Sequence, residues 1–252
     1  MGVILETGPD EYRRTGLSDS LCSHQYIEFY RCVSSRITDG VLALPAYLKD
    51  AGYQNPSNGN DCAFQLKYNT KSHFFDFIKS NPKVAAEFHN NLSTYSQGRL
   101  SWTDPSIYDV TQLIQGMKIG EDEVVLVDVG GGQGHDISEF RRQLPNITGA
   151  RAYFMHRIFH DWADEESRKI LKNLTPAMKR GYSKLLIHEQ VIPETRANWE
   201  STSLDLMMMA QLGGMERLAA DWKSLLESVG LKITKIWTPQ TGDESLVECE
   251  LA

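Results

Sequence analysis

Apolar and polar positions follow different patterns in the two halves of this 252-residue chain. In the first half, apolar side chains recur at helical spacing, which predicts helices over Asp39–Leu48, Phe64–Ile78 and Val84–Tyr95. Pro105 is expected to open a further helical stretch toward Met117, and the polar segment Gly52–Asn60 is expected to be a loop. The first half is therefore expected to be mainly helical.

The first residues predict a small β-ribbon. Val3–Glu6 is expected to be a short strand, Gly8-Pro9-Asp10 a turn, and Tyr12–Thr15 a second strand that pairs with the first. Because a two-stranded ribbon is only marginally stable in water, we expect it to lean on the helices that follow.

The second half alternates between short apolar runs and amphipathic segments, which is typical of an α/β fold. The expected strands are Val124–Val129, Ala152–Phe159, Lys184–Ile192, Leu231–Thr238 and Ser245–Leu251. The connection between the last two strands is too short for a right-handed crossover, so this pair is expected to be antiparallel.

The helices between these strands are marked by their end signals. They are expected at His135–Leu144, at Asp164–Met178 with a kink or a break at Pro176, at Thr202–Leu212, and between a capping Asp221 and Gly230. The short, charged segment Gly116–Glu123 has no periodic apolar face. We place the domain boundary there, with a helical region over residues 1–118 and an α/β domain over residues 119–252.

The stretch Val124–Asp136 reads VVLVDVGGGQGHD, a buried strand that runs into a glycine turn and then a helix. This order is typical of a nucleotide-binding α/β unit, because glycines admit a close ligand and a helix N-terminus offers free N–H groups. The glycines of this turn are Gly130, Gly131, Gly132 and Gly134. The spacing Gly130-x-Gly132-x-Gly134 is one residue shorter than the dinucleotide-binding pattern GxGxxG, which favours a cofactor without a pyrophosphate. A purely structural tight turn is the alternative. Asp128 at the strand end suits a cationic group of a cofactor.

Composition excludes several classes of function. The net charge of −7 and the lack of a basic stripe argue against nucleic acid as the main partner. No apolar run approaches the length of a membrane span, and the N-terminus lacks the features of a signal peptide. The four cysteines show no CxxC pairing and are expected to be reduced thiols, which favours a cytoplasmic protein.

His160-Asp161-Trp162 directly follows an expected strand, where open α/β sheets bind ligands. A neutral histidine there is suited to act as a general base toward a phenol or alcohol, and a helix-capping His-Asp pair is the alternative. Glu189 lies in an apolar strand, where an unpartnered acid is costly to bury. Glu216 is expected to be either a helix-start acid or a second partner for His160.

Three motifs taken together resemble the S-adenosylmethionine-dependent O-methyltransferases of the caffeate type, and most nearly their fungal secondary-metabolite branch. They are Asp128-x-Gly130-Gly131-Gly132-x-Gly134, His160-Asp161-Trp162-x-Asp164, and Gly213-Gly214-x-Glu216-Arg217 with Trp222 downstream. The stretches TGPDEYRRT, LPAYLKDAGYQNPS and GRLSWTD resemble the N-terminal half of these enzymes, so the resemblance covers nearly the whole chain.

The resemblance implies a Rossmann-like class I methyltransferase sheet, preceded by a helical domain with a winged-helix remnant. It implies that His160 deprotonates the acceptor hydroxyl, while Glu189 and Glu216 flank and orient the imidazole. S-adenosylmethionine is the implied cofactor. Its implied contacts are Asp128, Gly130, Gly131, Gly132, Gly134, His156 or its neighbour Arg157, and Trp162 near the adenine. Met208 and Met209 are expected to line the acceptor pocket, although methionines on a helix are more often core.

Two departures from the family pattern affect this interpretation. The family has a long N-terminal helical segment that builds the dimer, whereas this chain starts at what resembles the wing, so a homodimer is expected to be weakened. After Pro145, about two β-α units, on the order of 40 residues, are expected to be absent, including the strand that ends in the ribose-binding acid. Asp161 is an alternative source of that acid if Ala152–Phe159 fills the place of the second strand.

The sequence therefore predicts methyl transfer from S-adenosylmethionine to a hydroxyl of a small aromatic or polyketide-type secondary metabolite. Two alternatives stay open. A pericyclase on the same fold would use the cofactor or only its pocket, and a non-catalytic pseudo-methyltransferase would fit the missing segments.

Overall fold

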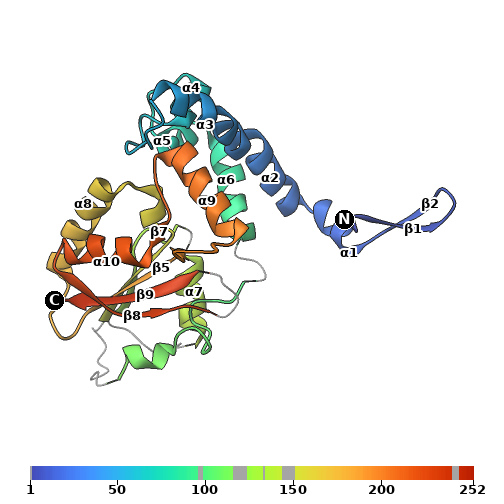
Figure 1. Ribbon diagram of the computed structural model, residues 1–252. Helices are drawn as coiled ribbons and strands as arrows, with labels where there is room; N and C mark the ends of the chain where they lie inside the picture. The colour runs from blue at the N-terminus through green and yellow to red at the C-terminus, as the bar shows by residue number, and fades with distance from the viewer. Residues whose placement is uncertain (1, 96–98, 116–123, 133, 144–150, 240–243) are drawn as a thin grey trace.

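The computed structural model describes residues 2–95, 99–115, 124–132, 134–143, 151–239 and 244–252. It consists of a group of helices beside a five-stranded sheet, with a hairpin that projects away from both (Figure 1). In the described part of the chain, none of the helices has the length and apolarity needed to cross a membrane.

The hairpin consists of β1 (Ile4–Gly8) and β2 (Glu11–Arg14), paired antiparallel as expected. Helix α1 (Gly16–Leu21) follows directly, and its N-cap Thr15 accepts a hydrogen bond from the Ser18 N–H. The ribbon does not lean on the helical domain as expected. All of its residues except Gly8 are exposed, and it extends away from the body of the molecule (Figure 1).

The helical region contains α2 (His24–Cys32), the π-helical turn η1 (Val33–Ile37), α3 (Thr38–Asp50), α4 (Ala63–Tyr68), α5 (Phe74–Lys79) and α6 (Pro82–Tyr95). The single helix expected over Phe64–Ile78 is wrong. Asn69 adopts a left-handed conformation with φ of 47°, which ends α4, and His73 caps a new helix, α5.

The helix expected from Pro105 toward Met117 is also wrong. The described residues of this stretch contain only the 3-10 turn η2 (Val110–Leu113), capped by Asp109. The apolar periodicity there reflects burial, because Trp102, Ile107 and Tyr108 pack into the core of the sheet.

The sheet has the strand order β3 (Val125–Asp128), β4 (Arg151–His156), β5 (Lys184–Glu189), β9 (Ser245–Leu251) and β8 (Leu231–Trp237). The first three strands are parallel, and the β8–β9 pair is antiparallel as predicted.

Strand β4 lies between β3 and β5, and β3 has no second neighbour among the described strands. The segment before His160 therefore fills the slot of the fourth strand of a class I sheet. This placement overturns the alternative in which Asp161 follows the second strand as the ribose acid. The free edge of β3 is where the two expected but missing units would pack.

Several element ends differ from the predictions. Strand β4 stops at His156 because Arg157 has a φ of 54°, and β5 is separated from the two-residue strand β6 (Val191–Ile192) by Gln190. Helix α8 (Asp164–Leu174) ends before Pro176, in the 3-10 turn η4 (Thr175–Ala177), so of the two expected effects of Pro176 the structure shows the break.

Two further helices have different starts from those predicted. Helix α9 (Trp199–Leu212) starts three residues before the predicted Thr202 because Asn198 caps it. The cap of α10 (Ala219–Glu227) is Leu218, and the Asp221 carboxylate accepts a hydrogen bond from the Leu218 N–H.

Contacts between the two halves cross the proposed domain division. Helix α9, from the second half, packs against α3 and α4 in the helical group (Figure 1). The buried side chains of residues 102–113 pack against β3, β4 and helix α7 (His135–Gln143). The boundary itself falls at residues 116–123, outside the described residues, so the division stays a prediction.

Candidate active site

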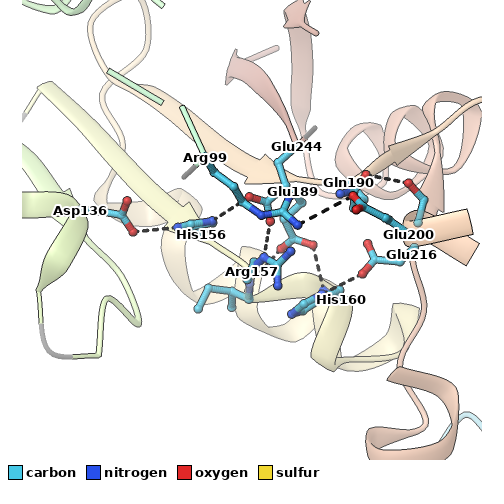
Figure 2. A network of polar contacts seen from close by, with 12 residues as sticks. Arg99, Asp136, His156, Arg157, His160, Glu189, Gln190, Glu200, Glu216 and Glu244 are labelled. Carbon is cyan, nitrogen blue, oxygen red and sulfur yellow. Dashed lines mark hydrogen bonds and ion pairs between the residues drawn. The ribbon is translucent and has the colours of Figure 1, made fainter. Parts of the chain in front are cut away.

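His160 and Glu216 form a buried pair beyond the carboxyl end of β4. His160 lies in the 3-10 turn η3 (Phe159–Asp161), and Glu216 precedes β7 (Arg217–Leu218). The imidazole Nδ1 lies 2.8 Å from Glu216 Oε1 (Figure 2). The other ring nitrogen, Nε2, lies 3.4 Å from Asp161 Oδ1. An Nδ1–H that donates to Glu216 leaves Nε2 as the atom that can exchange a proton with a ligand.

The charges around His160 favour its cationic form. Burial alone lowers the pKa of this imidazole, but the nearby carboxylates of Asp161 and Glu216 and the Nδ1 hydrogen bond raise the pKa to about 9. Burial also raises the pKa of Asp161, to about 6, against the opposing effect of His160. An imidazole in this setting is a strong base once its proton has left.

Glu189 lies close to His160 but does not bind the ring. Its carboxylate accepts hydrogen bonds from the backbone N–H groups of Ile158, Phe159 and His160, at 2.5 to 3.0 Å. Glu189 therefore holds the backbone of the turn, and one of its carboxylate oxygens also lies within 4.8 Å of an imidazole nitrogen of His160 and of the Glu216 carboxylate. Its expected role of flanking and orienting the imidazole stays a prediction. Burial raises the pKa of Glu189 to about 7, and the Phe159 N–H opposes that shift.

Arg217 holds the same turn from the other side, a role that the sequence did not suggest. Its guanidinium is fully buried and donates to the carbonyl oxygens of Phe159 and Trp162, at 2.8 and 2.9 Å. It also pairs with Asp164 and donates to the Ser167 hydroxyl. The only sequence signal is an arginine directly after Glu216 in a motif that reads GGMER.

The two glycines before Glu216 allow the backbones to approach closely. A Cβ on Gly214 would lie 2.1 Å from the carbonyl oxygen of His160, and the Met215 N–H donates to that oxygen at 3.1 Å. Gly213 ends α9 with a φ of 61°. The backbone around Glu216 is therefore attached directly to the backbone of its partner, His160.

The glycine turn after β3 forms a cradle beside an acid. Gly130, Gly132 and Gly134 all have positive φ, and a Cβ on Gly131 would lie 1.9 Å from Asp128 Oδ2. Both carboxylate oxygens of Asp128 are buried and accept no hydrogen bond from the described residues. Burial raises the pKa of this carboxyl to about 6. A buried acid that has no hydrogen-bond partner among the described residues and lies against the backbone of Gly131, where a side chain would clash, fits the ammonium group of an amino-acid-like cofactor.

The remaining residues predicted to contact the cofactor are engaged with protein groups. His156 Nδ1 lies 2.8 Å from Asp136 Oδ2, its Nε2 lies 3.3 Å from Glu244 Oε2, and Arg157 pairs with the same glutamate (Figure 2). Burial opposes the charge on His156, but Glu244 and Asp136 raise its pKa to about 10.

Trp162 stacks on the ring of His73, with centroids 5.1 Å apart and planes at 11°. Met208 packs in the helical core with Phe64 and Phe74, and Met209 packs against the cluster that contains Leu44. The predicted cofactor contact of Trp162 and the predicted pocket role of the two methionines stay predictions.

Comparisons with known proteins identify the family of this chain. A family model described as an O-methyltransferase domain matches residues 138–232. The O-methyltransferase mpaG' of Penicillium brevicompactum is 33% identical over 94% of this chain and 70% of its own length. The O-methyltransferase mfmE of Annulohypoxylon moriforme is 32% identical over 99% of this chain and 70% of its own length.

The alignment with mpaG' also bears on the missing segment. It runs over 277 positions but covers 94% of 252 residues, which is about 237, so about 40 aligned positions have no residue in this chain. Their expected place, after Pro145, lies largely outside the described residues and stays a prediction.

Solved structures share the fold. The LepI complex with SAM superposes with a TM-score of 0.89 and 22% identity, over 99% of this chain and 73% of that one. OxaC in complex with sinefungin and meleagrin superposes with a TM-score of 0.83 and 22% identity, over 100% of this chain and 73% of that one. Together with the curated relatives, these findings show that the chain belongs to the S-adenosylmethionine-dependent O-methyltransferase family.

Proposed function

We propose that this chain transfers the methyl group of S-adenosylmethionine to a hydroxyl of a small aromatic or polyketide-type metabolite, with His160 as the general base. The observation that carries the proposal is the pair of His160 and Glu216, in which a buried carboxylate accepts from Nδ1 and leaves Nε2 to take a proton. The curated relatives are named O-methyltransferases of fungi, which supports a secondary-metabolite acceptor.

In this proposal the acceptor hydroxyl gives its proton to His160 Nε2 as the oxygen attacks. Glu216 fixes the tautomer and, with Asp161, stabilises the imidazolium that forms. Glu189 and Arg217 are positioning residues, because they fix the backbone that carries His160 and do not bind its ring. Most of the rate enhancement is expected to come from positioning, which would hold the acceptor hydroxyl in the orientation that direct in-line attack requires while its proton faces His160.

The glycine turn is proposed to bind the amino-acid end of the cofactor. When bound, S-adenosylmethionine supplies an electrophilic methyl group on a sulfonium sulfur. The carboxylate of Asp128 would pair with the ammonium group, and the backbone of Gly130–Gly134 would lie against the same end. Because β3 has no further strand beside it in the described chain, fewer groups hold the adenosine end. Losing two or three hydrogen bonds, at roughly 1 kcal/mol each, weakens binding about 30- to 150-fold.

A labelled-methyl assay with a panel of phenolic acceptors tests the proposal. Wild-type protein is expected to yield a methylated product and S-adenosylhomocysteine, and His160→Ala is expected to lose turnover while still binding S-adenosylmethionine in calorimetry. Cofactor binding without any methylated product would favour the pericyclase alternative. Silence in calorimetry at millimolar cofactor would favour a non-catalytic protein.

We also propose a cytoplasmic location and a weak homodimer. The four cysteines are free, which agrees with a reducing compartment. Exposed apolar side chains on the hairpin and on the helices after it, namely Ile4, Leu5, Tyr12, Leu17, Ile27 and Tyr30, are available for association with a second copy. Light scattering after gel filtration tests the dimer, and a monomer at every concentration would reject it.

A further inference from the structure

A second cluster of ionisable side chains lies beside the proposed active site and takes no part in the mechanism above. His156 ends β4, His188 lies opposite it in register on β5, and Glu244 directly precedes β9. One potential ligand atom from each of the three lies within 4.8 Å of the other two. The cluster therefore joins three segments at the carboxyl edge of the sheet.

His188 is the least expected member of this cluster. Its side chain is 95% buried, and its Nδ1 is buried without a hydrogen-bond partner in the described part of the chain. The ring of His156 lies alongside, with centroids 4.5 Å apart. A buried polar atom with no partner is costly, so the unpaired nitrogen is itself an indication of a ligand.

His156 has the partners that a metal-binding histidine usually has. Its Nδ1 lies 2.8 Å from the Asp136 carboxylate, which directs Nε2 toward Glu244 Oε2 at 3.3 Å (Figure 2). Metal-bound histidines usually donate their other ring N–H to a carboxylate in this way. For metal–ligand bonds of about 2.0–2.1 Å, tetrahedral geometry separates two ligand atoms by about 3.3 Å.

We propose that His156, His188 and Glu244 form a site for one divalent transition-metal ion of the Zn²⁺ class. Two imidazoles and one carboxylate suit zinc or its neighbours, whereas Mg²⁺ and Ca²⁺ prefer oxygen ligands alone. Arg157 pairs with the Oε1 atom of Glu244, so Oε2 is the atom that would face the ion. Asp136 would orient His156 without binding the ion itself.

The neighbouring cluster of His160, Glu189 and Glu216 also brings its ligand atoms within 4.8 Å of one another, but it is not equivalent. The Glu189 oxygens accept from three backbone N–H groups, so they are committed to the turn. Glu216 Oε2 is, like His188 Nδ1, buried without a hydrogen-bond partner among the described residues. Every member of the first cluster, however, already has a role in the proposed mechanism, whereas His188 has none. The metal is therefore assigned to the second cluster.

Metal titration of the intact, chelator-treated chain tests the proposal. Calorimetry with Zn²⁺ is expected to show one ion per chain, and Co²⁺ is expected to give visible absorption bands typical of four-coordination. His188→Ala is expected to weaken Zn²⁺ binding at least tenfold. His24→Ala and Cys22→Ser, which remove exposed side chains that could bind zinc elsewhere, are expected to leave it unchanged.

A second variant covers the case in which His188→Ala does not fold, which circular dichroism would reveal. Asp136→Asn changes only the partly exposed residue that orients His156 and is expected to weaken Zn²⁺ binding about 10- to 100-fold. Absence of binding at millimolar Zn²⁺, or an affinity that neither variant changes, would overturn the site. In that case His156 would be a cationic side chain paired with the Asp136 and Glu244 carboxylates, without a metal-binding role. The methyl-transfer proposal would be unaffected by either result.

Discussion

His160 and Glu216 lie 56 residues apart in the chain, yet the imidazole Nδ1 is 2.8 Å from the carboxylate Oε1 and both side chains are buried. The contact joins the turn after β4 to the segment after α9. The glycine at position 214 makes this possible, because it lies against the carbonyl oxygen of His160. The pair is therefore built by close backbone contact as well as by charge.

The Glu216 carboxylate is expected to control the pH dependence of methyl transfer. Since only neutral His160 can take a proton, the wild-type rate should rise with pH, with a midpoint near the pKa of about 9, and level off above it. Glu216→Gln keeps an acceptor for Nδ1 but removes a charge that raises this pKa, so the midpoint should move to lower pH by about one unit or more. A pH–rate profile of each protein measures this midpoint. Glu227→Gln, an exposed change on α10, is the control, and an unshifted midpoint in Glu216→Gln would contradict the role of its charge.

Arg217 is expected to contribute strongly to stability. Replacing it by alanine leaves the carbonyl oxygens of Phe159 and Trp162 and the Asp164 carboxylate without their donor. Each buried acceptor left without its donor typically lowers the free energy of unfolding by about 1–3 kcal/mol, whereas the Asp164 side chain is 42% exposed and its lost ion pair adds little. Chemical denaturation measures this. Arg168→Ala breaks only more exposed ion pairs on α8 and should cost about 1 kcal/mol or less; equal losses in the two variants would argue against the positioning role.

Asp128 is expected to make cofactor binding depend on pH. Its carboxyl has a raised pKa of about 6, and only the ionised form can pair with an ammonium group. Affinity for S-adenosylmethionine should therefore fall as the pH drops through 6, and Asp128→Asn should bind weakly at every pH. Calorimetry between pH 5 and 8 measures both curves, with the exposed Asp50→Asn as the matched control. If the affinity of Asp128→Asn for S-adenosylmethionine changed with pH in the same way as that of the wild type, the ammonium group would have to bind away from Asp128.

Gly214→Ala is expected to abolish methyl transfer with little effect on the glycine turn. The new Cβ would lie 2.1 Å from the backbone carbonyl oxygen of His160. Relief of this clash requires a shift of the backbone, which should separate Glu216 from His160. Turnover should be lost while S-adenosylmethionine still binds. Gly16→Ala meets nothing within 4 Å and should behave as wild type. Full turnover in Gly214→Ala would show that the close contact is dispensable.

The parts of the fold that were predicted correctly are those with strong local signals. The strand–glycine–helix unit from β3 to α7 follows from an apolar run, four glycines and helical spacing within twenty residues. The antiparallel final pair follows from a connection too short to cross over. The misses arise where a single backbone conformation overrides periodicity, as at Asn69, which splits one predicted helix, and at Arg157, which ends β4.

The site was predicted less completely than the fold. His160 and Glu216 were expected to be partners from the family resemblance, because no spacing rule brings together residues so far apart. That Glu189 also accepts hydrogen bonds from the backbone of the turn was not predicted, because a sequence does not display which backbone groups a carboxylate meets. Arg217 and the second histidine cluster depend on which strands are neighbours and in which register, and His156 meets His188 only because β4 and β5 pair in that register.

A crystal structure of the protein with S-adenosylhomocysteine and a methyl-accepting phenol tests the central claim most directly. The account predicts that the amine of the bound product lies within hydrogen-bond reach of the Asp128 carboxylate. It also predicts that the phenol oxygen lies about 2.6–3.2 Å from His160 Nε2, on the side from which the methyl arrives. A phenol bound away from His160, or a product molecule that leaves Asp128 and the glycine turn untouched, would contradict it.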